Sequence, residues 1–185
     1  MLRSLFAIVI LTLPVYAQDE HPARTSAGCG SQAIQYAVKG DKTPHPIVTP
    51  EPGKAAVYIV QQEKRDVDSL NLWAVTTRIG LDGAWQGANH GQSHSLLSVD
   101  PGEHHLCVDW QSSLKEFSNA GSATTFTAEA GKTYYFLATV EERQKHEPAI
   151  LLEAIDPAEG QLLISKSSLS KSHPKNKGGP AASFN

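Results

Sequence analysis

The sequence has little excess charge of either sign and few long apolar runs, and each shortage excludes a class of protein. It carries 16 Lys and Arg against 19 Asp and Glu, a formal net charge of -3, whereas nucleic-acid-binding domains have a clear basic excess. Apart from the run at residues 5–13, no stretch comes near the roughly 20 apolar residues that a membrane-spanning helix needs. We therefore expect neither a nucleic-acid partner nor a transmembrane segment in the mature chain.

Catalytic signatures are missing as well. The chain has no Gly-x-Ser-x-Gly motif, which places a nucleophilic serine on a sharp strand-to-helix turn. It also lacks a glycine-rich loop that leads from a strand into a helix and could hold a phosphate group. No pair of carboxylates is marked out by its neighbours. We therefore expect a protein that is not an enzyme and that binds no cofactor.

The first 17 residues have the pattern of a cleavable signal peptide. Arg3 supplies the positive charge, residues 5–13 form the apolar region, and Val15-Tyr16-Ala17 fits a cleavage site before Gln18. The pattern predicts export to the periplasm or the extracellular space. Ser26-Ala27-Gly28-Cys29 resembles the end of a lipobox, but polar residues separate it from the apolar run, so we do not expect lipidation.

Two cysteines, Cys29 and Cys107, remain after this processing. An even number of cysteines in an oxidising compartment favours a disulfide. A Cys29–Cys107 bridge would close a loop of 79 residues, counted from the two positions in the sequence. The alternative is two unpaired cysteines, one of them buried.

Short apolar stretches separated by turn residues predict an all-β fold. Residues 55–60 are apolar at both parities, as in a strand covered on both faces. Asp82-Gly83 suits a type I′ hairpin turn. From 103 to 110 the residues alternate, with Leu106 and Val108 on the inward face and Cys107 on the outward one. About seven to nine strands of this kind indicate an antiparallel β-sandwich with one short helical turn near the C-terminus.

Composition divides the chain further. Residues 123–128 and 133–140 are expected to pair as a hairpin, and Asp156-Pro157 is expected to open the helical turn. The last 16 residues contain lysines but no acid, which favours a disordered tail. The expected organisation is a signal peptide at 1–17, a leader segment at 18–32, a β-sandwich domain at 33–169 and the disordered tail at 170–185.

Several sequence blocks resemble an uncharacterised family of secreted bacterial β-sandwich proteins, similar in style to transthyretin-like and PEGA-like surface modules. The blocks are Gly53-Lys54-Ala55-Ala56-Val57-Tyr58, Arg78-Ile79-Gly80-Leu81-Asp82-Gly83-Ala84-Trp85, Pro101-Gly102-Glu103-His104-His105-Leu106-Cys107, Trp110-Gln111-Ser112-Ser113 and Ala130-Gly131-Lys132-Thr133-Tyr134-Tyr135. The resemblance covers roughly residues 29–174. It implies a sandwich fold and an envelope or extracellular location, and it brings no catalytic motif.

The function that we expect is binding of an envelope protein or glycan through loops at the sheet ends. Trp85 follows the Asp82-Gly83 turn, where an exposed indole could stack on a sugar or a peptide, and His90 and His94 flank the next loop. Trp85 could instead pack over its own hairpin. The lysines near the C-terminus could touch an anionic surface or could simply be solvated; they are Lys166, Lys171, Lys175 and Lys177.

The alternative function is metal binding. His105, Cys107 and Asp109 share one face of a strand, and imidazole, thiolate and carboxylate are ligands for Zn²⁺ or Cu²⁺. More imidazoles would gather at this sheet end if the strands of His94 and His105 paired across the Pro101-Gly102 turn. A disulfide at Cys107 would remove the thiolate, so the state of that cysteine separates the two hypotheses.

Overall fold

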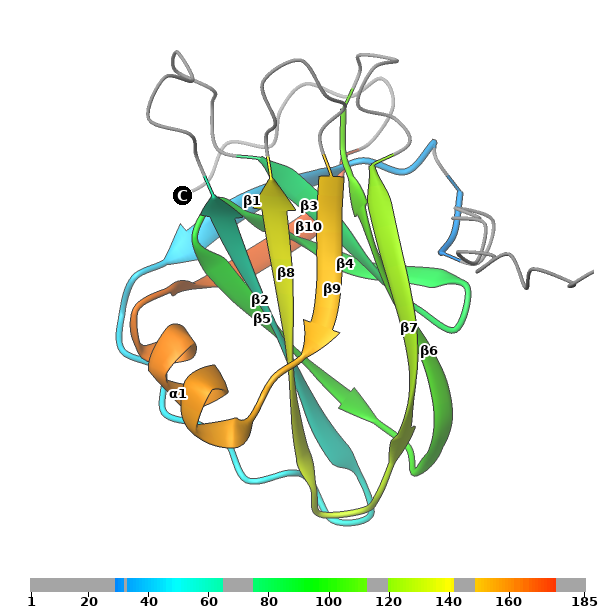
Figure 1. Ribbon diagram of the computed structural model, residues 1–185, viewed down its shortest axis with the longest axis vertical. Coiled ribbons are helices and arrows are strands. Elements are labelled where there is room, and N and C mark those ends of the chain that lie inside the picture. The colour runs from blue at the N-terminus through cyan, green and yellow to red at the C-terminus, as the bar shows by residue number, and fades with distance from the viewer. Residues whose placement is uncertain (1–28, 32, 65–74, 113–119, 142–148, 176–185) are drawn as a thin grey trace, which may run out of the picture.

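The computed structural model describes residues 29–31, 33–64, 75–112, 120–141 and 149–175, and in these ranges the chain forms ten strands and one helix (Figure 1). In chain order they are β1 (Tyr36–Asp41), β2 (Ala55–Lys64), β3 (Thr76–Leu81), β4 (Ala84–His90), β5 (Ser93–Val99), β6 (Gly102–Trp110), β7 (Gly121–Ala128), β8 (Thr133–Glu141), β9 (Ala149–Ala154), α1 (Pro157–Ser165) and β10 (Ser168–Pro174).

The strands form two sheets that pack on one apolar core. Sheet A has the order β1-β10-β5-β2-β8-β9, and sheet B has the order β4-β3-β6-β7. The expected β-rich fold with two layers is confirmed, but the expected strand count and pairing are wrong in two respects. Ten described strands exceed seven to nine, and sheet A is mixed, because β2 runs parallel to β8 and β10 runs parallel to β5.

The core follows the alternation of the strands. Val57 and Ile59 of β2 meet Leu106 and Val108 of β6 between the sheets, and all four are completely or almost completely buried. The other parity of β2 is buried too, because α1 covers the outer face of sheet A, where Ile164 packs in the same cluster as β2 and β8 (Figure 1). The expectation that residues 55–60 form a strand covered on both faces is confirmed.

One expected hairpin is confirmed, a second is wrong, and the pairing considered for the strands of His94 and His105 is not formed. Asp82 and Gly83 both have positive φ angles, 52° and 83°, as a type I′ turn requires, and β3 pairs with β4. In contrast, β7 lies in sheet B and β8 in sheet A, and β5 and β6 are likewise divided between the sheets. These turns carry the chain across the core because the strands on both sides have an apolar face to bury. His94 and His105 therefore lie on different sheets.

The C-terminal part is more ordered than the composition indicates. Asp156 caps α1 by accepting hydrogen bonds from two backbone amides, as expected, but the helix has nine residues rather than one turn. β10 then pairs with β1, and every residue of β1 has a partner in β10. The expected tail is thus wrong for residues 170–174, whereas the rest of the tail after residue 175, the signal peptide and most of the leader lie outside the described residues.

Candidate functional site

The segment just before β1 crosses the outer face of sheet B, and we call its described residues, 29–31 and 33–35, the strap. Cys29 forms a disulfide with Cys107 of β6, and their Cα atoms are 5.7 Å apart. The predicted bridge is therefore confirmed. Cys107 points away from Leu106 and the core between the sheets, yet it is completely buried, because the strap covers it.

The strap lies so close to β3 that the position beneath it has to be a glycine. Gly80 is opposite Cys107 in the ladder between β3 and β6. A Cβ atom at Gly80 would lie 2.7 Å from the Cys107 Sγ and 2.7 Å from the Cys29 carbonyl oxygen. The missing side chain therefore makes room for the Cys107 sulfur and for the backbone of the strap at Cys29.

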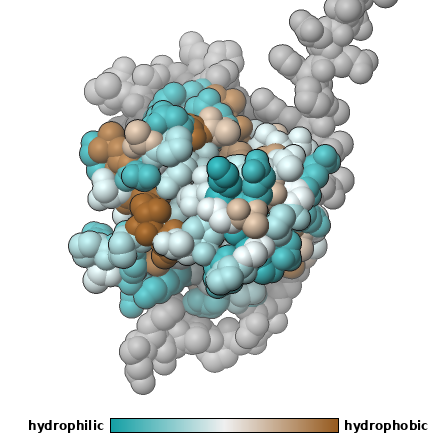
Figure 2. Space-filling view, turned by 90° about the horizontal axis from the view of Figure 1, so that it is seen from below, coloured by the Kyte–Doolittle hydropathy of each residue, from teal (hydrophilic) through white to brown (hydrophobic). Residues whose placement is uncertain are grey.

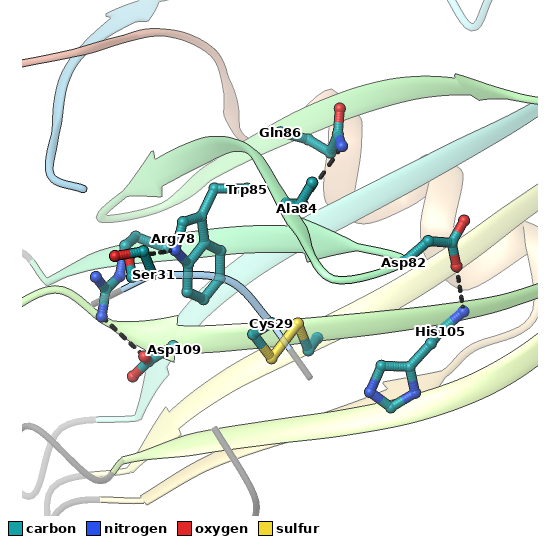
Figure 3. The surroundings of a disulfide bond; sticks show 10 residues. Cys29, Ser31, Arg78, Asp82, Ala84, Trp85, Gln86, His105 and Asp109 are labelled. Carbon is teal, nitrogen blue, oxygen red and sulfur yellow. Dashed lines mark hydrogen bonds and ion pairs between the residues drawn. A yellow bond between two sulfur atoms is a disulfide. The ribbon is translucent and has the colours of Figure 1, made fainter. Parts of the chain in front are cut away.

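Trp85 lies beside this crossing and contacts the strap (Figure 3). Its Nε1 donates a hydrogen bond of 2.8 Å to the Ser31 carbonyl oxygen, and the Arg78 guanidinium lies 4.8 Å from the ring centroid. Gly30 is so close that a Cβ atom there would come within 2.9 Å of the indole. These contacts are those of a half-buried tryptophan that packs against its own chain, and a role of Trp85 in binding stays a prediction.

Arg78 and Asp109 form an ion pair under the same strap. They are opposite one another on β3 and β6, with 2.8 Å between Nη2 and Oδ2, and each side chain is 3% exposed. The guanidinium also donates to the Ile34 carbonyl oxygen over 3.0 Å. The pair therefore anchors the end of the strap as well as joining two strands.

The residues of the metal hypothesis share a face, but the side chains of two of them are engaged elsewhere. Cys107 is in the disulfide and the Asp109 carboxylate pairs with Arg78, while the backbone amide of His105 bonds to Asp82 (Figure 3). In the part of the chain that the structure describes, no group of three or more His, Cys, Asp or Glu side chains could hold a metal ion. His105, Cys107 and Asp109 therefore do not form a ligand set here.

The residues expected to meet a partner are not brought together. Trp85 lies under the strap, and the two histidines belong to different sheets. His90 is exposed at the end of β4, with its Nδ1 2.9 Å from Thr76 Oγ1. His94 of β5 is 2% exposed, with its Nδ1 2.8 Å from Ser167 Oγ. His94 is thus part of the packing of sheet A.

His94 makes stability depend on acid. Burial and, to a smaller extent, the nearby charge of His45 lower its pKa to about 4. The unfolded chain takes up this proton near pH 6.5, so the free energy of unfolding is expected to fall by roughly 3 kcal/mol as the pH drops from about 6.5 to about 4. His94→Gln keeps a polar group beside Ser167 and does not titrate. Urea unfolding across this range should show a flatter profile for the variant, and an unchanged slope would contradict the assignment.

His104 has the opposite effect on the pH dependence of stability, because its pKa is raised. Its Nδ1 is 2.7 Å from Asp82 Oδ2, and its Nε2 is 2.8 Å from the Asp100 carbonyl oxygen. Burial disfavours the charged ring, but these two bonds outweigh burial and raise the pKa of His104. Its stabilising effect is complete below about pH 6.5 and is lost as the pH rises through the raised pKa. Both ring nitrogens hold a turn in place.

A surface feature that sequence analysis missed lies at the β1 edge of sheet A. Lys39 of β1 is directly opposite Lys171 of β10, and Asp41 is opposite Leu169. Leu169 in turn pairs with His94, which lies in the row of Val60 on the α1 side of the sheet. The side chains of Lys39, Asp41 and Lys171 therefore project on that side.

An open hollow of about 660 Å³ lies among these side chains, which we call the basic hollow; it is lined by Lys39, Gly40, Asp41, Lys42, Thr43, Pro44 and Lys171. The Asp41 carboxylate is 2.8 Å from the Lys171 Nζ and accepts a 2.7 Å bond from the Thr43 hydroxyl. Hydrogen bonds from Lys171 and Thr43 hold the pKa of Asp41 well below its usual range. Of the lysines in this hollow, the sequence analysis singled out only Lys171, near the C-terminus. Lys39 of β1 and Lys42 after it supply the other two.

No helix in the described ranges is both long and apolar enough to span a membrane. Comparisons of the chain with protein-family models, with curated proteins and with solved structures found no match. The resemblance to secreted bacterial β-sandwich proteins therefore stays a prediction.

Proposed function

We propose that the protein is an exported, non-catalytic β-sandwich module of the periplasm or extracellular space that binds an envelope protein or glycan through the basic hollow. The observation that carries the proposal is the hollow itself. Exposed lysines from β1, from the residue after β1 and from β10 surround it, although the chain as a whole has a net negative charge. Such a surface attracts groups that carry negative charge.

Export is supported by the covalent structure and by the N-terminal sequence. Disulfides form and persist in oxidising compartments and are rare in the cytosol. The Cys29–Cys107 bridge is compatible with such a compartment, and residues 1–17 have the pattern of a signal peptide.

A non-catalytic role is supported by how the chemically capable side chains are used. Cys107 is bridged, and Asp109 pairs with Arg78. The ring of His94 is buried, and both ring nitrogens of His104 are bonded within one turn region. In each case the contact holds parts of the fold together, which supports binding in preference to catalysis.

The proposed function can be tested by cross-linking. A photo-activated cross-linking residue at Pro44, in the hollow, should form a higher-mass adduct in the envelope fraction of the source cells. The matched control is the same residue at Glu153, which is exposed on β9 at the other edge of sheet A. Adducts at neither position, or equally at both, would show that the hollow is not the partner site.

A further inference from the structure

The basic hollow belongs to a longer strip of positive charge along the paired strands β1 and β10. We call residues 36–42 and 168–175 the basic ribbon. It contains four lysines and one acid, a formal charge of +3 (4 − 1) in a chain whose net charge is -3. All four lysine side chains are exposed; they are Lys39, Lys42, Lys171 and Lys175.

The ribbon is long enough to meet an extended molecule at several points. Its described pairing runs from Leu169, opposite Asp41, to Pro174, opposite Tyr36, and the Lys175 amide continues it with a bond to the Gln35 carbonyl oxygen. At about 3.3 Å a residue, the six steps from 169 to 175 span about 20 Å. The lysines are thus spread along a line and do not surround one point.

Lysines from both strands of the ribbon meet at one register position. Like charges directly opposite one another on paired strands destabilise a sheet, and Lys39 is directly opposite Lys171. Asp41 is the only acid in the ribbon and pairs with Lys171. A ligand with several negative charges would be attracted to the exposed lysines of both strands, so the arrangement favours a polyanion.

We propose that the partner is a linear acidic polysaccharide that lies along the basic ribbon with its carboxylate or sulfate groups at the lysines. This inference rests on the proposed function, because it names the partner of the same hollow. A single small anion would use one end of the ribbon only. A polymer with repeated charges meets Lys42, the pair of Lys39 and Lys171, and Lys175 in turn.

Two other polyanions fit the surface less well. Protein surfaces that bind membranes combine basic side chains with apolar and aromatic ones that enter the lipid. The large apolar residues that are exposed in the described ranges are aliphatic and are spread over separate segments: Ile34, Ile47, Val48, Leu151 and Leu162. Figure 2 shows apolar patches divided by hydrophilic surface on the face in view. Single-stranded nucleic acids stack on aromatic rings, and the only Phe, Trp or Tyr of the ribbon, Tyr36, is buried.

The test compares binding by the full mature chain and by two charge-reversed variants. The probes are heparin, as a sulfated chain, and polygalacturonate, as a carboxylated one. K39E/K171E should weaken binding of at least one probe roughly tenfold or more, since two cations become anions at the site. The control K64E/K132E makes the same change in net charge at exposed lysines of β2 and of the turn before β8. It should bind like the unaltered protein, and both variants should unfold near the same urea concentration.

Further probes separate the outcomes. Neutral dextran should not bind, and added salt should weaken binding because it screens exposed charges. Binding only to anionic phospholipid vesicles, or only to oligonucleotides, would overturn the inference, and so would equal losses in both variants. If neither polysaccharide binds but Pro44 still gives its cross-link, the polysaccharide is wrong and the binding function stands. If the cross-link fails as well, both proposals are wrong.

Discussion

Replacing Cys29 with serine is expected to lower the free energy of unfolding by about 4.5 kcal/mol, the chain-entropy value for a bridge with a sequence separation of 78. The reason is that the unfolded chain gains the freedom that the bridge removes. The strap also loses its covalent attachment over Gly80. Urea unfolding at neutral pH without reductant measures the effect.

The double variant Cys29→Ser/Cys107→Ala is the informative control. Each single substitution already breaks the bridge, so the double variant should lose little more than the larger single loss. Unaltered protein in the presence of a reductant should resemble the variants, and a chelator should change nothing. If the free energy of unfolding of Cys29→Ser is within about 1 kcal/mol of the value for the unaltered protein, the bridge contributes much less than loop closure implies.

Replacing Asp109 with alanine is expected to cost about 3–5 kcal/mol, because it leaves the buried Arg78 charge without its carboxylate. Both side chains are 3% exposed, so water can do little to compensate. The indole of Trp85 and the Ile34 carbonyl oxygen still contact the guanidinium, but neither carries a full negative charge. The same unfolding assay measures the loss.

Removal of both charges provides the comparison. Arg78→Met/Asp109→Leu replaces the pair with apolar side chains, and such replacements are often neutral or stabilising. The double variant should therefore be more stable than Asp109→Ala alone. A double variant that is at least as unstable would show that the strap depends on the arginine hydrogen bond to Ile34 more than on the charge of the pair.

Strand alternation was enough to locate many of the buried positions. It placed Leu106 and Val108 in the core and Cys107 on the opposite face of the strand. Because Cys107 was expected to form a bridge with Cys29, the segment that carries Cys29 was expected to cover that face. Asp82-Gly83 identified its hairpin because a type I′ turn needs two residues with positive φ angles, and Asp-Gly is one of the few pairs that adopt them readily. These inferences succeeded because each depends on a few neighbouring residues.

The remaining features depend on contacts that alternation does not encode. A period of two tells which face of a strand is buried but not which strand lies beside it, so β7 and β8 looked like a hairpin although they belong to different sheets. Trp85 has the sequence context of an exposed turn, and its contacts with the strap come from residues that are far away in the sequence. Lys39 and Lys171 are far apart in the sequence, and nothing local shows that β1 pairs with β10.

The pairing of β1 with β10 ties the start of the described domain to its end, and this has a consequence for biosynthesis. Until residues 168–174 have been made, β1 lacks its neighbour and the exposed edge of β5 stays open. Pairings between such distant segments form slowly, and open strand edges invite association with other chains. A nascent or truncated chain that ends before residue 168 carries Lys39 and Lys42 but not their partners. Chain completion is therefore a precondition for assembling the lysine surface, and a fragment that ends before residue 168 lacks the half of it that β10 supplies.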